Sequence, residues 1–257
     1  MKFHVRGRLA HTDRPELSAE IASWIRTGRL PFGRFAVGSW LPTVFESYAR
    51  ILHPAWSARN EPIRWDIVAS WSGRNMHSLA QWDWISQPLD KERGQVPFTQ
   101  PPRMGALPIS QLSRLRELLA QSTGTPDLCY SGYWDGFGWV PYSDLAEAPA
   151  LVLDQRTYLI RPCSLNTPDE AIWRVPGTDP RSEPPTVVWP SDRNWFVASD
   201  PDLDSTLVGG SAALVAAILD DPALEAWPVA ANDATSGGDP GTWLQVRARQ
   251  PSSANRT

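Results

Sequence analysis

Residues 187–219 read VVWPSDRNWFVASDPDLDSTLVGGSAALVAAIL and contain the strongest local signals in the chain. They predict a turn, a strand, an acidic loop, a Gly-Gly-Ser corner and then a helix. Ser211 stands at the position of a helix N-cap, and Asp220-Asp221-Pro222 ends the helix. Because a closely specified backbone and several polar side chains coincide here, we expect any functional site to lie beside this segment.

The flanking sequence alternates predicted helices with predicted extended segments. Apolar residues at helical spacing predict helices over 17–28, 62–71, 76–85 and 110–122. We expect Pro62 in the first turn of the second helix and Ser110 as the N-cap of the last. Extended segments are predicted over 34–40, 44–52, 128–140 and 150–165, the last of these being a hairpin that turns at 154–156. Two proline-rich stretches, 88–108 and 167–186, predict exposed connections, and long connections are often binding elements or simply mobile.

This order of elements shows no βαβ rhythm, no internal repeat and no linker between two cores. It predicts a single α+β domain over residues 1–230, with helices packed on a mostly antiparallel sheet. Residues 231–257 are rich in Gly, Ser, Asp, Asn and Arg and poor in apolar residues, so they predict a flexible polar tail. Docking of residues 243–246 onto the domain is the alternative for this tail.

The composition argues against two classes of partner. The net charge of −4 disfavours broad binding to nucleic-acid phosphates, which needs a basic surface. The N-terminal sequence MKFHVRGRLAHTDRPEL has no apolar core of a signal peptide, and no run approaches the ~20 apolar residues of a membrane span. We therefore expect a cytoplasmic protein with no membrane partner.

The chain contains 2 cysteines and 14 tryptophans. Cys129 and Cys163 belong to no CxxC or Cys/His cluster, so we expect buried free thiols and neither a zinc site nor a cofactor. A disulfide in an oxidising compartment is the alternative. The tryptophans are spread along the whole chain, which favours large core side chains over an exposed ligand platform.

Residues 189–214 resemble a family of actinobacterial proteins that carry WPxDRxW followed by DxxxTxVGGS. The matching residues are Trp189, Pro190, Asp192, Arg193, Trp195, Thr206, Val208, Gly209, Gly210 and Ser211, with Asp202 or Asp204 as the acid. This resemblance implies no established activity, so no catalytic residue is carried over. A second resemblance, to SMI1/KNR4-type immunity and binding domains, rests on GYWDGFGW at residues 132–139 and concerns the fold alone.

Several candidate sites are open, each with a structural alternative. The Val208-Gly-Gly-Ser corner can bind an anion or simply cap a helix. The alternating acids Asp200, Asp202 and Asp204 can hold a hard cation or form a solvated turn. A glutamate, a histidine, an arginine and a tyrosine can form an acid–base or oxyanion site, or the histidines can be structural. The residues that we expect to form a binding site are Glu46, Arg50, His53, His77, Trp134, Asp192, Arg193, Asp204, Thr206 and Ser211.

The first functional hypothesis is a protein-binding, regulatory domain of the immunity type. It follows from the net negative charge, the many aromatic residues and the absence of any complete catalytic motif. The alternative is a hydrolase or transferase that uses an acid–histidine pair, with arginine binding an anionic substrate. That alternative requires the histidines to meet a carboxylate in one pocket. The sequence leaves the substrate, the partner and the oligomeric state open.

Overall fold

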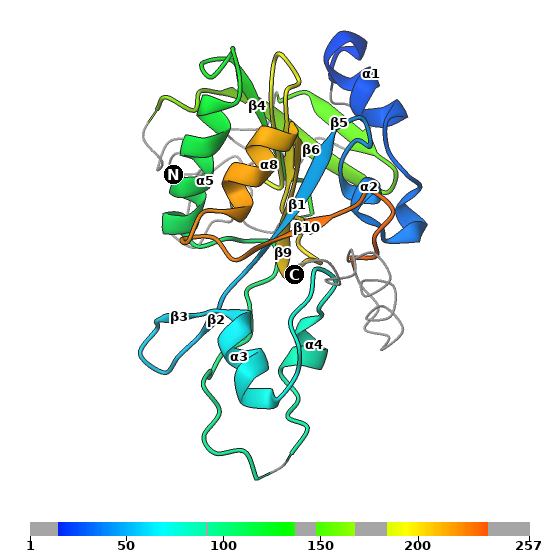
Figure 1. Ribbon diagram of the computed structural model, residues 1–257. Helices are drawn as coiled ribbons and strands as arrows, with labels where there is room; N and C mark the ends of the chain where they lie inside the picture. The colour runs from blue at the N-terminus through cyan, green and yellow to red at the C-terminus, as the bar shows by residue number, and fades with distance from the viewer. Residues whose placement is uncertain (1–14, 91, 137–147, 168–183, 236–257) are drawn as a thin grey trace, which may run out of the picture.

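The computed structural model describes residues 15–90, 92–136, 148–167 and 184–235. Its main feature is an eight-stranded sheet in the order β10-β1-β9-β8-β7-β4-β6-β5, in which every neighbouring pair is antiparallel (Figure 1). The predicted class, a single α+β domain with helices on an antiparallel sheet, is confirmed. The strands of the sheet are β1 (Ser47–Leu52), β4 (Cys129–Trp134), β5 (Ala150–Leu153), β6 (Arg156–Cys163), β7 (Val187–Pro190), β8 (Phe196–Ala198), β9 (Ser205–Gly210) and β10 (Ala226–Val229).

Helices cover both faces of the sheet (Figure 1). On one face α5 (Ile109–Gln121) and α8 (Ala212–Leu219) pack against the sheet through leucines, isoleucine and valines. On the other face lie α1 (Ala19–Thr27) and the short α2 (Val37–Trp40). Successive residues of β9 alternate between these two cores, since Val208 belongs to the first and Leu207 to the second.

A smaller lobe, residues 53–104, packs against one end of the sheet (Figure 1). It contains the ribbon β2–β3 (Ala55–Trp56 and Pro62–Ile63) and the helices α3 (Trp65–Ser72) and α4 (Trp82–Ile85). The lobe has its own apolar core around Trp65, to which Leu52 of β1 also contributes. Because Leu52 ends β1, the lobe begins directly where that strand leaves the sheet.

The segment 187–219 contains three strands where we expected one. β7, β8 and β9 form consecutive antiparallel pairs, and the acidic loop joins β8 to β9. The helix that follows is confirmed as α8, and Ser211 caps it by accepting a hydrogen bond from the Leu214 amide at 3.2 Å. Gly209 must lack a side chain, because a Cβ there would lie 2.5 Å from the Phe45 ring. The predicted hairpin over 150–165 is also confirmed, as β5–β6.

Residues 34–40 are not extended, contrary to the prediction. A 3₁₀ turn, η2 (Phe32–Arg34), leads through Phe35 to α2. The cause is tertiary, because the backbone amides of Val37 and Gly38 donate to the carbonyls of Asp233 and Ala231, at 2.9 and 2.8 Å. Residues 231–235 therefore belong to the domain, beyond the boundary that we predicted at 230. The predicted flexibility of residues 236–257 concerns a part of the chain outside the described residues.

Three helix starts also differ from the predictions. The helix predicted over 76–85 is present only as α4, and α5 begins after Pro108 with Ser110 already inside its first turn. Pro62 lies in β3, and α3 begins at Trp65. Glu225 explains that start, because its carboxylate accepts the amides of Trp65 and Asp66 at 2.7 and 2.9 Å. A cap from a residue so distant in sequence leaves no local pattern.

Glu225 and Glu46 offer a matched test of this tertiary capping. Glu225 is buried, whereas Glu46 is exposed and accepts the Ala212 amide at the start of α8 at 3.0 Å. We expect E225A to lower the free energy of unfolding by about 2 kcal/mol, because the buried amide of Trp65 and the partly buried amide of Asp66 lose their acceptor. E46A should cost less than about 1 kcal/mol, because water replaces its carboxylate. Chemical denaturation of both variants measures the difference, and equal costs would contradict the capping role of Glu225.

Candidate functional site

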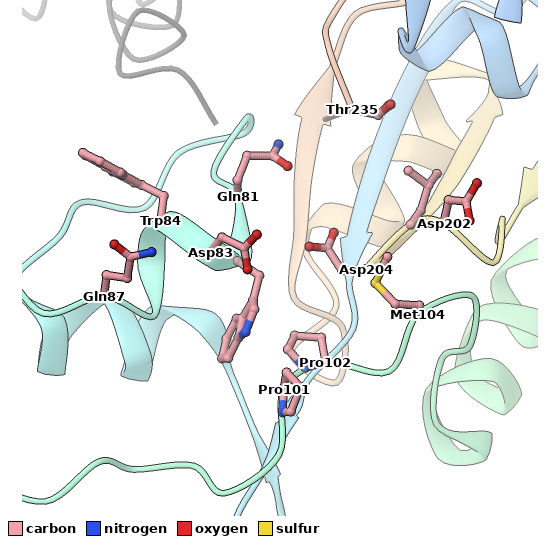
Figure 2. Close-up of a pocket in the computed structure, with 12 residues that line it drawn as sticks. Gln81, Asp83, Trp84, Gln87, Pro101, Pro102, Met104, Asp202, Asp204 and Thr235 are labelled. Carbon is pink, nitrogen blue, oxygen red and sulfur yellow. The ribbon is translucent and has the colours of Figure 1, made fainter. Parts of the chain in front are cut away.

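A cavity of about 580 Å³ lies between the lobe and the end of the sheet (Figure 2). Among the described residues, its lining contains three aspartates, two glutamines and two tryptophans, and no basic residue. The lobe provides Gln81, Trp82, Asp83, Trp84, Gln87, Pro101, Pro102 and Met104. The other wall is made by Asp202, Leu203, Asp204 and Thr235. The acidic loop predicted to lie beside a functional site therefore forms one wall of this cavity.

Backbone hydrogen bonds fix the position of this acidic loop. The Gly105 amide donates to the carbonyl of Leu203 at 2.8 Å, and the His53 amide donates to that of Asp204 at 3.0 Å. Gly105 has a φ of 72°, and a Cβ at this position would lie 2.9 Å from the Cα of Pro201. Only glycine combines this backbone conformation with such close approach. These contacts hold the loop between the lobe and the end of the sheet.

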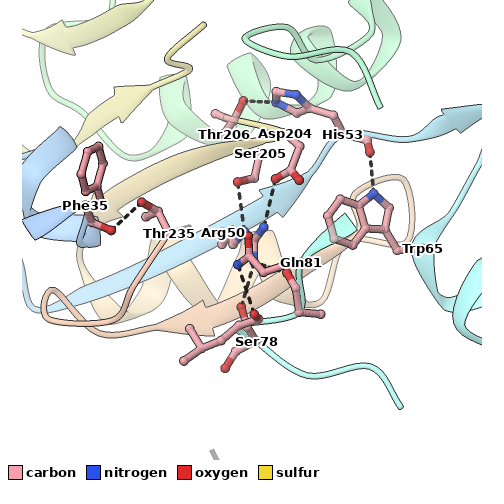
Figure 3. A network of polar contacts seen from close by, with 12 residues as sticks. Phe35, Arg50, His53, Trp65, Ser78, Gln81, Asp204, Ser205, Thr206 and Thr235 are labelled. Atoms are coloured by element: carbon pink, nitrogen blue, oxygen red, sulfur yellow. Dashed lines mark hydrogen bonds and ion pairs between the residues drawn. The ribbon is translucent and has the colours of Figure 1, made fainter. Parts of the chain in front are cut away.

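Arg50 connects the sheet side of the cavity with the lobe side through buried and partly buried hydrogen bonds (Figure 3). Its side chain is 2% exposed, and it donates to Asp204 Oδ1 at 3.0 Å and to Ser205 Oγ at 3.0 Å. On the lobe side it donates to the carbonyls of Ala80 at 2.7 Å and Ser78 at 3.4 Å. The planar guanidinium thereby orients Asp204 and holds residues 78–80 opposite it.

His53 is completely buried and is bonded on both sides of its ring (Figure 3). Its Nδ1 lies 2.7 Å from the carbonyl oxygen of Arg103, so this nitrogen carries the proton. Its Nε2 then accepts from the hydroxyl of Thr206 at 2.9 Å, and Thr206 lies 2.5 Å from Ser199 Oγ. Burial lowers the pKa of His53 to about 4. Neither ring nitrogen bonds a carboxylate, so His53 forms no acid–histidine pair.

His77 lies in the same region but does not line the cavity. It is 9% exposed, and its Nδ1 accepts from the Leu79 amide at 3.3 Å. Burial, and secondarily the charge of Arg50, lower its pKa. The structure therefore brings Arg50, His53, His77, Asp204 and Thr206 together, as the predicted site requires, while leaving both histidines outside the cavity wall.

The acids of the loop are not simply a solvated turn. Asp200 is 1% exposed and accepts from Arg156 Nη2 at 3.0 Å, and the same nitrogen contacts the exposed Asp202. Burial raises the pKa of Asp200 to about 6. Arg156 also stacks over the Trp134 ring, 4.7 Å from its centroid. Of the two interpretations left open for these acids, a solvated turn does not describe Asp200, which is buried, whereas Asp202 is exposed but paired with Arg156.

The remaining predicted residues have structural contacts elsewhere. Glu46 and Ser211 cap α8, and Asp192 accepts from the hydroxyl of Thr123 and the amide of Gly124, both at 2.7 Å. Arg193 donates to the carbonyl of Glu20. For the Gly-Gly-Ser corner, the structure therefore favours capping of α8 over anion binding. The ten predicted residues do not converge in one pocket.

The cavity also contains residues that sequence reasoning missed. Asp83 and Trp84 are exposed in α4, and Met104 is 48% exposed at the end of the proline-rich stretch. The available signal was the length and proline content of this stretch, for which a binding element was one of two interpretations, since Pro101, Pro102 and Met104 all line the cavity. No motif marks Asp83, which is brought to the cavity only by the packing of the lobe.

Three remaining features concern the cysteine thiols, metal binding and membrane spans. Cys129 and Cys163 face each other across β4 and β6 with free thiols, and burial raises their pKa values to about 12 and about 11. Within the described ranges, no group of three or more His, Cys, Asp or Glu side chains is placed to hold a metal ion. None of the described helices has the length and apolar character needed to cross a bilayer.

Comparison with known proteins adds no relative. No protein-family model, no curated protein and no solved structure matches this chain. The resemblances to the actinobacterial family and to SMI1/KNR4-type domains therefore stay predictions. Any function proposed for the chain rests on the cavity and on the residues around it.

Proposed function

We propose that the protein acts by binding another protein, and that the cavity receives a cationic side chain of that partner. The observation that carries this proposal is a cavity whose lining, over the described residues, includes three aspartates and no basic residue. Arg50 and Arg156 already bond Asp204 and Asp202, but Asp83 has no ion pair among the described residues. An added guanidinium or ammonium group would therefore be attracted to this wall.

The shape and the apolar part of the lining suit an arginine or lysine side chain. A volume of about 580 Å³ accommodates such a side chain together with part of its backbone. Trp82, Pro101 and Pro102 provide apolar surface for the methylene groups, while the carboxylates bind the charged end. The two glutamines add hydrogen-bonding groups to the lining.

A protein partner is favoured by two exposed apolar residues in the lining of the cavity. Trp84 is 37% exposed and Met104 48% exposed, and tryptophan and methionine are enriched in protein interfaces. The regulatory role expected from the sequence would then consist of covering a basic surface on another protein. An immunity-like protein that covers a basic surface of its target would use the same binding chemistry. The buried, fully bonded His53 gives no support to the enzymatic alternative.

Asp83 provides the sharpest test, because it is exposed and removing its charge breaks no contact among the described residues. We expect D83N to leave the free energy of unfolding unchanged and to weaken binding of an arginine-containing peptide by about fivefold, the loss of one exposed charge contact. E20Q is the matched control, since Glu20 is an exposed acid on α1, away from the lobe (Figure 1). Isothermal titration of both variants measures the effect. Equal affinities for D83N and E20Q would contradict the proposed cavity.

A further inference from the structure

Phe35 has a backbone conformation that is unfavourable for a bulky residue. Its φ of 46° and ψ of 36° lie in the left-handed region, which glycine and asparagine adopt with little cost. Its ring is not a core side chain, since Phe35 is 46% exposed and packs only partly against Phe32, with the ring centroids 5.7 Å apart. A strained and exposed aromatic residue thus occupies a position where glycine or asparagine would adopt the same backbone with less strain.

The surrounding hydrogen bonds hold this conformation and connect it to the cavity (Figure 3). The amide and the hydroxyl of Thr235 both donate to the Phe35 carbonyl, at 2.8 and 2.7 Å. The indole of Trp40 donates to the same Thr235 hydroxyl at 2.9 Å. Since Thr235 lines the cavity, the residue that fixes Phe35 is also part of the proposed binding site.

We propose that the Phe35 ring is a second contact point for the partner, beside the acidic cavity, and that it binds an apolar side chain. Strained backbone persists mainly where a function requires it, and aromatic residues are frequent anchors in protein interfaces. The recognised segment then combines an arginine or lysine for the cavity with a neighbouring apolar residue for Phe35. This inference rests on the proposed function and specifies the chemistry of the partner.

The variant F35N separates the role of the ring from that of the backbone. Asparagine accepts the left-handed conformation, so the carbonyl can keep its hydrogen bonds to Thr235 and the thermal midpoint should be unchanged or higher. The probes are peptides with one arginine and either leucine or alanine at several spacings from it. For wild type, we expect one leucine peptide to bind more tightly than its alanine counterpart. F35N should weaken that leucine peptide about tenfold and leave the alanine peptide unaffected.

F35Y, which keeps an aromatic ring, should retain the preference for leucine, and so should L128A, which removes an exposed apolar side chain just before β4. If the alanine peptides bind wild type but no leucine peptide gains affinity, or if F35N preserves the gain, the role of Phe35 is overturned while the cavity stands. If no arginine peptide binds wild type, the proposed function fails and this inference with it.

Discussion

R50M should lower the free energy of unfolding by about 3–5 kcal/mol, because breaking a buried ion pair leaves an uncompensated charge. Arg50 is 1% exposed and donates to Asp204, Ser205 and two carbonyls of the lobe. Methionine fills much of the same volume but satisfies none of these acceptors. Urea denaturation with a two-state fit gives the cost directly.

The double variant R50M/D204N tests whether the cost arises from the ion pair. Removing the carboxylate as well removes the stranded charge, so the double variant should be less destabilised than the sum of the two single variants. R50K keeps the charge but lacks the planar fork, and we expect an intermediate loss. A cost below about 1 kcal/mol for R50M would show that Arg50 does not join the lobe to the sheet.

Acidification from pH 7 to pH 4 should remove about 3 kcal/mol of the stability that His53 confers. The pKa of His53 is about 4 in the folded protein, against an ordinary value of 6.5. Between these values the unfolded chain binds more protons than the folded chain, so stability falls as the pH falls. The contribution is fully present above pH 6.5 and is lost as the pH passes down to about 4.

Asp200 acts in the opposite direction over much of this range, because its pKa is raised to about 6. The measurement therefore compares wild type with H53Q, which keeps a donor and an acceptor but does not titrate. Asp200 contributes equally to both proteins, so it cancels in the difference. The difference in free energy of unfolding between wild type and H53Q should become about 3 kcal/mol smaller from pH 7 to pH 4. A difference independent of pH would mean that His53 is protonated as easily in the folded protein as in the unfolded chain.

The elements with strong local signals were predictable from the sequence. The leucine spacing of α5, the cap at Ser211 and the turn of the β5–β6 hairpin all depend on residues within a few positions of one another. The sheet class followed from the absence of a βαβ rhythm. Errors appeared where a distant residue determines the conformation, as when Glu225 sets the start of α3 and residues 231–233 bind α2.

The candidate site was predictable only in part, for the same reason. The acidic loop was expected, and Arg50, His53, Asp204 and Thr206 were among the ten candidate residues, but no sequence pattern showed that these four contact one another. Their roles were not predictable, since burial of His53 becomes evident only when the lobe covers it. Asp83 reaches the cavity through packing of α4, and no pattern in the sequence relates it to Asp204.

Titration with a matched pair of peptides tests the central claim most directly. One peptide carries arginine, and the other carries citrulline, which has nearly the same shape but no charge. If the cavity binds a cationic side chain of a partner, the arginine peptide binds wild type at least about tenfold more tightly, and added salt reduces this advantage. Equal affinity for the two peptides, or no binding of either, would contradict the account.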